Sequence, residues 1–222
     1  MKNIKLAACI AFAILFAYKS NAQAINWAAM NAKQRYIANT NIGWDDGFVI
    51  GIGYGYQLHT KLPTVAHLSY SFPSGEKLFD DFKTKIGGTV QLYKIKNFRA
   101  SAIVEGIFRR YQNTDARLLN FGCELSTTIG YYKKKWFVAG QFGFDKAITT
   151  HFKHSAYYKE YYPGAKDGWY IPTGGNFLYG LQGGYSFKNY DINLKTGKTI
   201  TQDFKTNPMV PYYFQLGFNC RF

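Results

Sequence analysis

The last twelve residues, from Pro211 to Phe222, constrain the fold of this chain more than any other segment. Apolar and polar positions alternate there without a break. One phase holds Tyr212, Phe214, Leu216, Phe218, Cys220 and Phe222, and the other holds Tyr213, Gln215, Gly217, Asn219 and Arg221. A period of two residues places successive side chains on opposite faces of a β-strand. The segment therefore predicts a long strand with one apolar and one polar face.

The same alternation recurs along the chain, with turn signals between the segments. We expect ten strands, at residues 35–44, 47–58, 64–72, 82–94, 98–110, 117–132, 136–149, 176–187, 190–201 and 211–222. The fold class is therefore all-β. Eight strands is the alternative, if Arg35–Trp44 and one weaker segment are not strands.

The terminal strand resembles that of bacterial outer-membrane β-barrels. Gln215, Gly217, Cys220 and Phe222 occupy the polar, glycine, apolar and aromatic positions of that family's C-terminal assembly signal. The resemblance implies a transmembrane antiparallel up-and-down β-barrel in the cell outer membrane of a Gram-negative bacterium. It also implies that the barrel assembly machinery is a partner, because that machinery reads the signal.

The first 22 residues have the anatomy of a secretory signal peptide. Two lysines lie within Met1–Lys5, an apolar run follows from Leu6 to Tyr18, and small residues surround Ala22. Cleavage after Ala22 would leave Gln23 first, which resembles exported proteins of the Bacteroidota type. We therefore expect a signal peptide at 1–22 and one barrel domain at 23–222.

The lengths of the connections predict an orientation. Short connections are expected at residues 94–97, 133–135 and 188–189, and long ones at 72–81 and 150–175. Outer-membrane barrels keep short turns in the periplasm and long loops outside the cell. With the C-terminus in the periplasm, an even strand number follows.

The charge balance is strongly basic, with 27 Lys and Arg against 13 Asp and Glu, a formal charge of +14. Such a balance can indicate nucleic-acid binding. Because the chain is expected to be exported, we expect no nucleic acid and instead contacts with outer-membrane lipid and the phosphates of lipopolysaccharide. Cys123 and Cys220 fall in the outward phase of distant strands, so no disulfide is expected. We expect no cofactor and no metal site, including at His151 and His154.

Charged residues also fall in the phase that faces the lumen of such a barrel. Because buried charges must pair, a salt-bridge network that occludes the lumen is predicted. Its members are Lys83, Lys85, Arg99, Glu105, Arg109, Glu124, Asp145 and Lys195, with Arg117, Asp191 and Arg221 in the same predicted phase. The alternative is a narrow, porin-like passage for small anionic solutes.

The segment from Thr150 to Gly175 is the main candidate for function. Loops on a rigid scaffold often carry binding sites, and tyrosine and tryptophan offer stiff contact area with a polar tip. Candidate ligand-binding residues are Tyr157, Tyr158, Tyr161, Tyr162, Trp169 and Tyr170. A structural or surface-binding role follows, with a surface protein or a glycan as the ligand. An aromatic belt at the membrane surface is the alternative.

His67-Leu68-Ser69 resembles the His-x-Ser spacing of outer-membrane lipid A deacylases, in which a glutamate orients the histidine. That family's motif continues with Asn and lies late in the barrel, whereas Tyr70 follows here. The predicted phase also turns both side chains inward. We therefore expect no catalytic residues and no enzyme, with a lipid A-modifying hydrolase as the remaining alternative.

Overall fold

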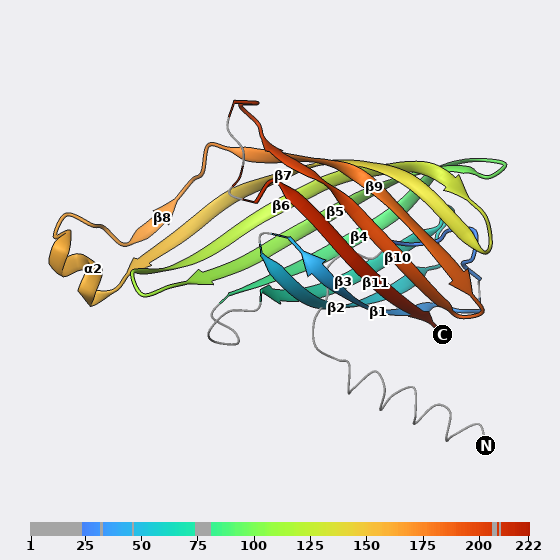
Figure 1. Ribbon diagram of the computed structural model, residues 1–222, viewed down its shortest axis with the longest axis horizontal. Coiled ribbons are helices and arrows are strands. Elements are labelled where there is room, and N and C mark those ends of the chain that lie inside the picture. Colours follow the sequence, from blue (N-terminus) through green and yellow to red (C-terminus); the bar gives the residue numbers. More distant parts are fainter. Residues whose placement is uncertain (1–23, 32, 46, 74–80, 206–207, 209) are drawn as a thin grey trace, which may run out of the picture.

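The computed structural model describes residues 24–31, 33–45, 47–73, 81–205, 208 and 210–222. The predicted signal peptide lies outside these residues. Ten strands form the wall of a barrel (Figure 1): β1 (Tyr36–Trp44), β2 (Phe48–Leu58), β3 (Thr64–Pro73), β4 (Phe82–Ile95), β5 (Phe98–Gln112), β6 (Ala116–Tyr132), β7 (Trp136–His154), β9 (Gly175–Phe187), β10 (Tyr190–Thr201) and β11 (Tyr212–Arg221).

Each wall strand pairs antiparallel with its neighbours along the chain, and β1 pairs with β11 to close the ring. The closing register runs from Ile37 opposite Arg221 to Trp44 opposite Phe214. An eleventh strand, β8 (Gly168–Tyr170), pairs only with β7 and lies outside the ring. The predicted fold, a closed ten-stranded antiparallel barrel, is confirmed, and the eight-stranded alternative is wrong.

Burial is inverted relative to a water-soluble domain. Apolar side chains on the outer face are exposed, including Ile86 (64%), Leu125 (55%) and Leu181 (60%). Polar side chains facing the lumen, such as Asn39, Ser101 and Gln141, are buried. An apolar outside with a polar inside is the pattern of a transmembrane β-barrel, so the fold is that of an outer-membrane protein.

Two sets of aromatic side chains lie on the outer face near its two ends. One chain of ring contacts, the loop-side girdle, runs through Tyr70, Phe72, Phe82, Phe108, Phe121 and Trp169, with centroids 4.7–6.1 Å apart. The other, the turn-side girdle, includes Tyr36, Tyr54, Tyr56 and Phe222, then Phe98, Tyr131 and Trp136, then Phe187, Tyr190 and Phe218. Aromatic girdles mark the two membrane interfaces of such barrels.

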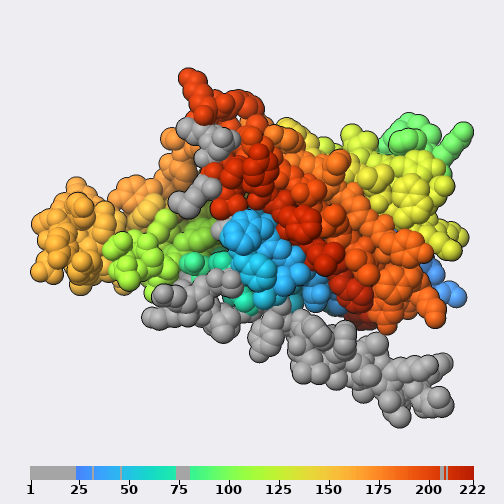
Figure 2. Space-filling model, viewed as in Figure 1, coloured from blue at the N-terminus to red at the C-terminus, as the bar shows by residue number. Residues whose placement is uncertain are grey.

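The barrel has two different ends. The turn end holds the C-terminus and the connections at 59–63, 96–97, 133–135 and 188–189. The loop end holds the remaining connections, and there β6 and β7 continue together beyond the point where β9 begins. Thr150–Gly175, predicted as a loop, differs: β7 runs to His154, the helix α2 (Ala156–Tyr161) follows, and β8 returns along β7. This arm projects from the barrel (Figures 1 and 2).

The strand extension has a simple cause. Residues 116–119 of β6 continue to offer hydrogen-bonding partners to β7 after β9 has ended at Gly175. The free edge of β7 then pairs with β8 at Thr150–Phe152. Among the described residues, no helix is long and apolar enough to cross a membrane.

Candidate functional site

The segment Ala24–Met30, which precedes β1, lies inside the turn end of the barrel and is called the plug here. Asn26 is 1% exposed and donates from Nδ2 to the Lys133 carbonyl (3.0 Å) and to Ser186 Oγ (2.8 Å). Asn219 Nδ2 donates to the Ala24 carbonyl at 2.8 Å. These bonds join the plug to three different parts of the wall.

Two arginines of the wall hold the plug backbone. Arg99 Nη1 donates to the Trp27 carbonyl at 3.2 Å, and Arg221 Nη1 donates to the Ala29 carbonyl. Carbonyls that are buried without a donor are costly, so these contacts satisfy groups that the plug would otherwise leave unpaired.

The plug also has an apolar core. Trp27 is 5% exposed and belongs to one buried cluster with Ile25, Tyr132 and Phe137. The Tyr132 and Phe137 rings are parallel, with centroids 5.4 Å apart. Sequence reasoning missed the plug, because residues 24–30 show no strand alternation. The sequence feature that could have indicated it is Trp27, a large apolar residue between the predicted signal peptide and the first predicted strand.

A charged cluster occupies the middle of the lumen. Glu105 on β5 and Glu124 on β6 are directly opposite each other in the register. Like charges in this arrangement repel. Lys85 on β4 lies between them, with Nζ 2.8 Å from Glu105 Oε2 and 2.5 Å from Glu124 Oε2. His67 Nε2 lies 2.7 Å from Glu105 Oε1. All four side chains are at most 14% exposed, so the charged cluster is buried within the barrel.

Further ion pairs lie toward the loop end. Arg109 contacts the Asp145 carboxylate and donates from Nη1 to Asn120 Oδ1 at 3.0 Å. Lys83 Nζ lies 3.2 Å from Asp45 Oδ2. Six of the eight predicted network residues therefore meet a partner of opposite charge. Asp45 was not among the predicted residues, since it directly follows the end of β1.

The other predicted lumen residues have different partners. Arg99 contacts Gln91 Oε1 (2.7 Å) and the plug, and no carboxylate among the described residues. Lys195 Nζ lies 5.5 Å from the centre of the Tyr213 ring. Arg221 pairs with Asp191 at 3.0 Å, both at most 2% exposed. Arg117 was predicted to face the lumen, and that prediction is wrong. It lies opposite Gln112 and shares the outward face of β6 with Leu119 and Phe121.

His67 and Ser69 both face the lumen. Their exposures are 9% and 8%, and the glutamate beside His67 is shared with Lys85. The side chains are thus buried inside the barrel, away from the lipid-facing surface at which a lipid A substrate would lie. Among the described residues, no group of three or more His, Cys, Asp or Glu side chains could hold a metal ion. Among the described residues, Cys123 and Cys220 form no disulfide.

The arm carries an ordered aromatic surface. Ser155 caps α2, since its Oγ accepts the Tyr158 N–H at 3.1 Å. Rings pack in pairs along the helix, Tyr157 with Tyr161 (5.0 Å) and Tyr158 with Tyr162 (4.8 Å). Tyr157, Tyr161 and Tyr162 remain 60–66% exposed. The α2 tyrosines are therefore both held in place and accessible.

Asp167 ties the two strands of the arm together. Its Oδ2 lies 2.6 Å from Lys159 Nζ, and its Oδ1 accepts the His154 N–H at 2.9 Å. These hydrogen bonds hold the pKa of the Asp167 carboxyl well below its usual range, and the bond from Lys159 has the largest effect. The His154 ring also stacks on Tyr158 at 5.0 Å, which links this contact to α2.

The six predicted ligand-binding residues fall into two groups. Tyr157, Tyr158, Tyr161 and Tyr162 lie on or directly after α2. Trp169 instead packs on Phe121 and extends the loop-side girdle, and the Tyr170 ring meets Phe152 edge to face at 5.3 Å. The six residues thus lie in two places, on the arm's helix and against the aromatic side chains of the barrel wall and β7.

The four residues of the predicted assembly signal lie on or next to β11, which closes the ring with β1. Gln215 is buried in the lumen, and Gly217 packs against Asn193, leaving no room for a Cβ. Phe222 stacks on Tyr36 at 5.6 Å, and the two residues exchange backbone hydrogen bonds of 2.9 Å. Cys220 lies on the outer phase of β11 opposite Ala38.

Comparison with known proteins gives a fold-level likeness. No family model matches the sequence, and no curated protein matches it. Two solved structures that resemble the barrel are a KdgM porin in complex with disordered oligogalacturonate and a KdgM porin. Their identities are 9% and 8%, with TM-scores of 0.43 and 0.41, and each match covers 84% of this chain and 99% of the other. A likeness at this identity concerns the fold alone, and it does not indicate that this protein transports or binds the same solute.

Proposed function

We propose that this protein is an outer-membrane barrel with a closed lumen, which presents the α2 tyrosines outside the cell as a binding surface for a glycan or a protein. The single observation that supports this most is the combination of a plugged, ion-paired lumen with an ordered, exposed aromatic arm. A rigid scaffold that displays stiff aromatic side chains is suited to binding rather than to transport.

The orientation in this proposal follows from the connections. The turn end, with its short hairpins and the C-terminus, faces the periplasm, and the loop end faces outward. Export through the signal peptide at 1–22 and recognition of Gln215, Gly217, Cys220 and Phe222 by the barrel assembly machinery belong to the same proposal. The Phe222–Tyr36 contact supports it, because the signal residue also closes the ring.

A conductance measurement tests the closed lumen. The refolded chain without residues 1–22 is inserted into a planar bilayer, and no steady unitary current is expected. A steady current that changes its ion selectivity in a Lys83→Gln variant would contradict the closed lumen and favour a narrow pore for small anions.

A second experiment tests the arm. Glycan arrays and purified lipopolysaccharide are probed with the barrel in nanodiscs, comparing the wild type with a Tyr157→Ser/Tyr161→Ser/Tyr162→Ser variant. Capture should fall at least about tenfold, since exposed aromatic anchors dominate such interfaces. Phe204→Ser is the matched control, because Phe204 is 69% exposed at the same end but outside the arm. Equal capture by all three proteins would refute the binding role.

A further inference from the structure

Six of the lysines at the turn end are called the lysine rim here; Lys61, on the connection between β2 and β3, is not among them. They are Lys94, Lys96, Lys133, Lys134, Lys135 and Lys188, on three hairpins. The four connections at this end, residues 59–63, 96–97, 133–135 and 188–189, contain no Asp or Glu. Among the described residues, no carboxylate lies within ion-pair distance of a rim lysine. The rim is therefore a concentration of positive charge without an internal counter-ion.

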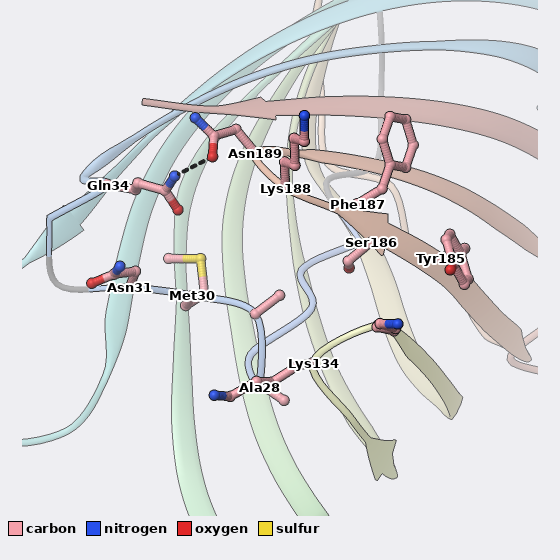
Figure 3. Close-up of a pocket in the computed structure, with 12 residues that line it drawn as sticks. Ala28, Met30, Asn31, Gln34, Lys134, Tyr185, Ser186, Phe187, Lys188 and Asn189 are labelled. Carbon is pink, nitrogen blue, oxygen red and sulfur yellow. Dashed lines mark hydrogen bonds between the residues drawn. The ribbon is translucent and has the colours of Figure 1, made fainter.

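Two hollows open beside the β6–β7 turn. The first has a volume of about 620 Å³, and six of its ten lining residues are basic: Lys94, Lys96, Arg99, Lys133, Lys134 and Lys135. The second, of about 770 Å³, lies between the plug, the β6–β7 turn and the β9–β10 turn (Figure 3). Lys134, Lys135 and Lys188 line it. A concave surface lined by one sign of charge attracts ions of the other sign.

The backbone of the rim gives a second, independent observation. Lys96 and Lys188 have φ angles of 51° and 54°, in the left-handed region. Each is the first residue of a two-residue Lys-Asn hairpin turn, where glycine or asparagine is usual because a Cβ is disfavoured. In both turns the asparagine comes second, at Asn97 and Asn189. Lysine in the strained position of two turns indicates a role for its ammonium group that turn geometry does not explain.

The rim lies at the level of lipid headgroups. Lys133 Nζ is 5.7 Å from the ring centres of both Tyr131 and Trp136, which belong to the turn-side girdle. Such girdles mark the interface between acyl chains and headgroups. Lysines just beyond them reach the phosphates, and clustered lysines attract anionic lipid.

We infer that the lysine rim binds the phosphate groups of anionic lipids in the leaflet around the turn end. The site needs only that the barrel lies in a membrane, and it is independent of the arm. Its recognition chemistry is a phosphate-bearing headgroup with net negative charge, held by ammonium groups from neighbouring hairpins.

The test compares lipid retention by variants of the full barrel. The protein is reconstituted in nanodiscs of phosphatidylcholine mixed with phosphatidylglycerol, and native mass spectrometry counts the retained lipids. The rim variant is Lys96→Gly/Lys134→Gln/Lys188→Gly, and the matched control is Lys153→Gln/Lys166→Gln/Lys198→Gln at the loop end. The preference for phosphatidylglycerol should fall about fivefold for each rim ammonium removed and stay unchanged in the control.

Two outcomes would overturn the inference. One is equal phosphatidylglycerol retention by the wild type and the rim variant. The other is pyrophosphate binding, measured by calorimetry in pure phosphatidylcholine nanodiscs, that the rim variant loses, since this would assign the rim to a soluble phosphate ligand. The thermal unfolding of each variant is measured in parallel, and Lys134→Gln alone, at a turn residue without positive φ, should show a single fivefold loss.

Discussion

The loop end and the turn end are built from the same antiparallel hairpins, yet they balance their charges differently. At the loop end, cations lie beside carboxylates in the connections themselves, as Lys159 does beside Asp167 at 2.6 Å. At the turn end, the carboxylate beside the mouth, Asp191, is 1% exposed and pairs with Arg221 inside the wall. The lysine rim outside is left without counter-ions. The arm at the loop end thus pairs a cation with a carboxylate in its own connection, whereas the connections of the turn end contain no carboxylate.

The largest expected effect comes from breaking the buried pair at the turn end. Arg221→Ala leaves Asp191 charged and buried, and it removes the donors to the Lys188 and Ala29 carbonyls. The free energy of unfolding should fall by about 3–5 kcal/mol. Urea unfolding of the refolded barrel measures it. Lys159→Ala, which breaks the exposed pair at the loop end, should lower the free energy of unfolding far less, because solvent screens exposed ion pairs. Equal costs would remove the contrast between the ends.

A smaller effect is expected from loosening the plug. Asn26→Ala removes the donor to the Lys133 carbonyl and to Ser186 Oγ, both in a buried setting. The docking free energy of the plug should fall by about 1–3 kcal/mol. Hydrogen exchange should then quicken in residues 24–31 and remain unchanged in the arm. Faster exchange in both regions would mean that the plug is not an independent element.

Relieving backbone strain in the rim should stabilise the barrel. Lys96→Gly and Lys188→Gly each remove a Cβ from a left-handed position and should each raise the free energy of unfolding by about 0.5–1 kcal/mol. Phe204→Gly, at φ 56° in the loop end, should have a similar effect without removing charge. A loss of stability in the two lysine variants, but not in Phe204→Gly, would show that the lysines have a structural role.

The smallest effect is a pH dependence confined to the arm. The folded-state pKa of Asp167 is depressed, so its contribution is fully present above the ordinary aspartate pKa of about 4 and is lost as the pH falls through the lowered value. The protection of residues 150–170 against hydrogen exchange, relative to the intrinsic rate at each pH, should fall below about pH 4, while the protection of the plug stays constant. Asp167→Asn should abolish this dependence. A dependence that persists in the variant would assign it to another group.

Sequence alternation predicted the wall closely. All ten wall strands begin within one residue of the predicted positions. The inward face of His67, Glu105 and Glu124 was predicted in the same way. The extension of β7 from Thr149 to His154 was not predicted, because it depends on β6 and β8 as pairing partners.

What the sequence determined by itself is therefore local: the number of strands, their faces and the tight turns, since a period of two residues is a property of each segment alone. Only the tertiary structure decided which charges meet and where the plug lies. Asn219 reaches the Ala24 carbonyl across 195 positions of the chain. That contact exists only once β1 has paired with β11, because closing the ring creates the lumen in which residues 24–30 can be buried.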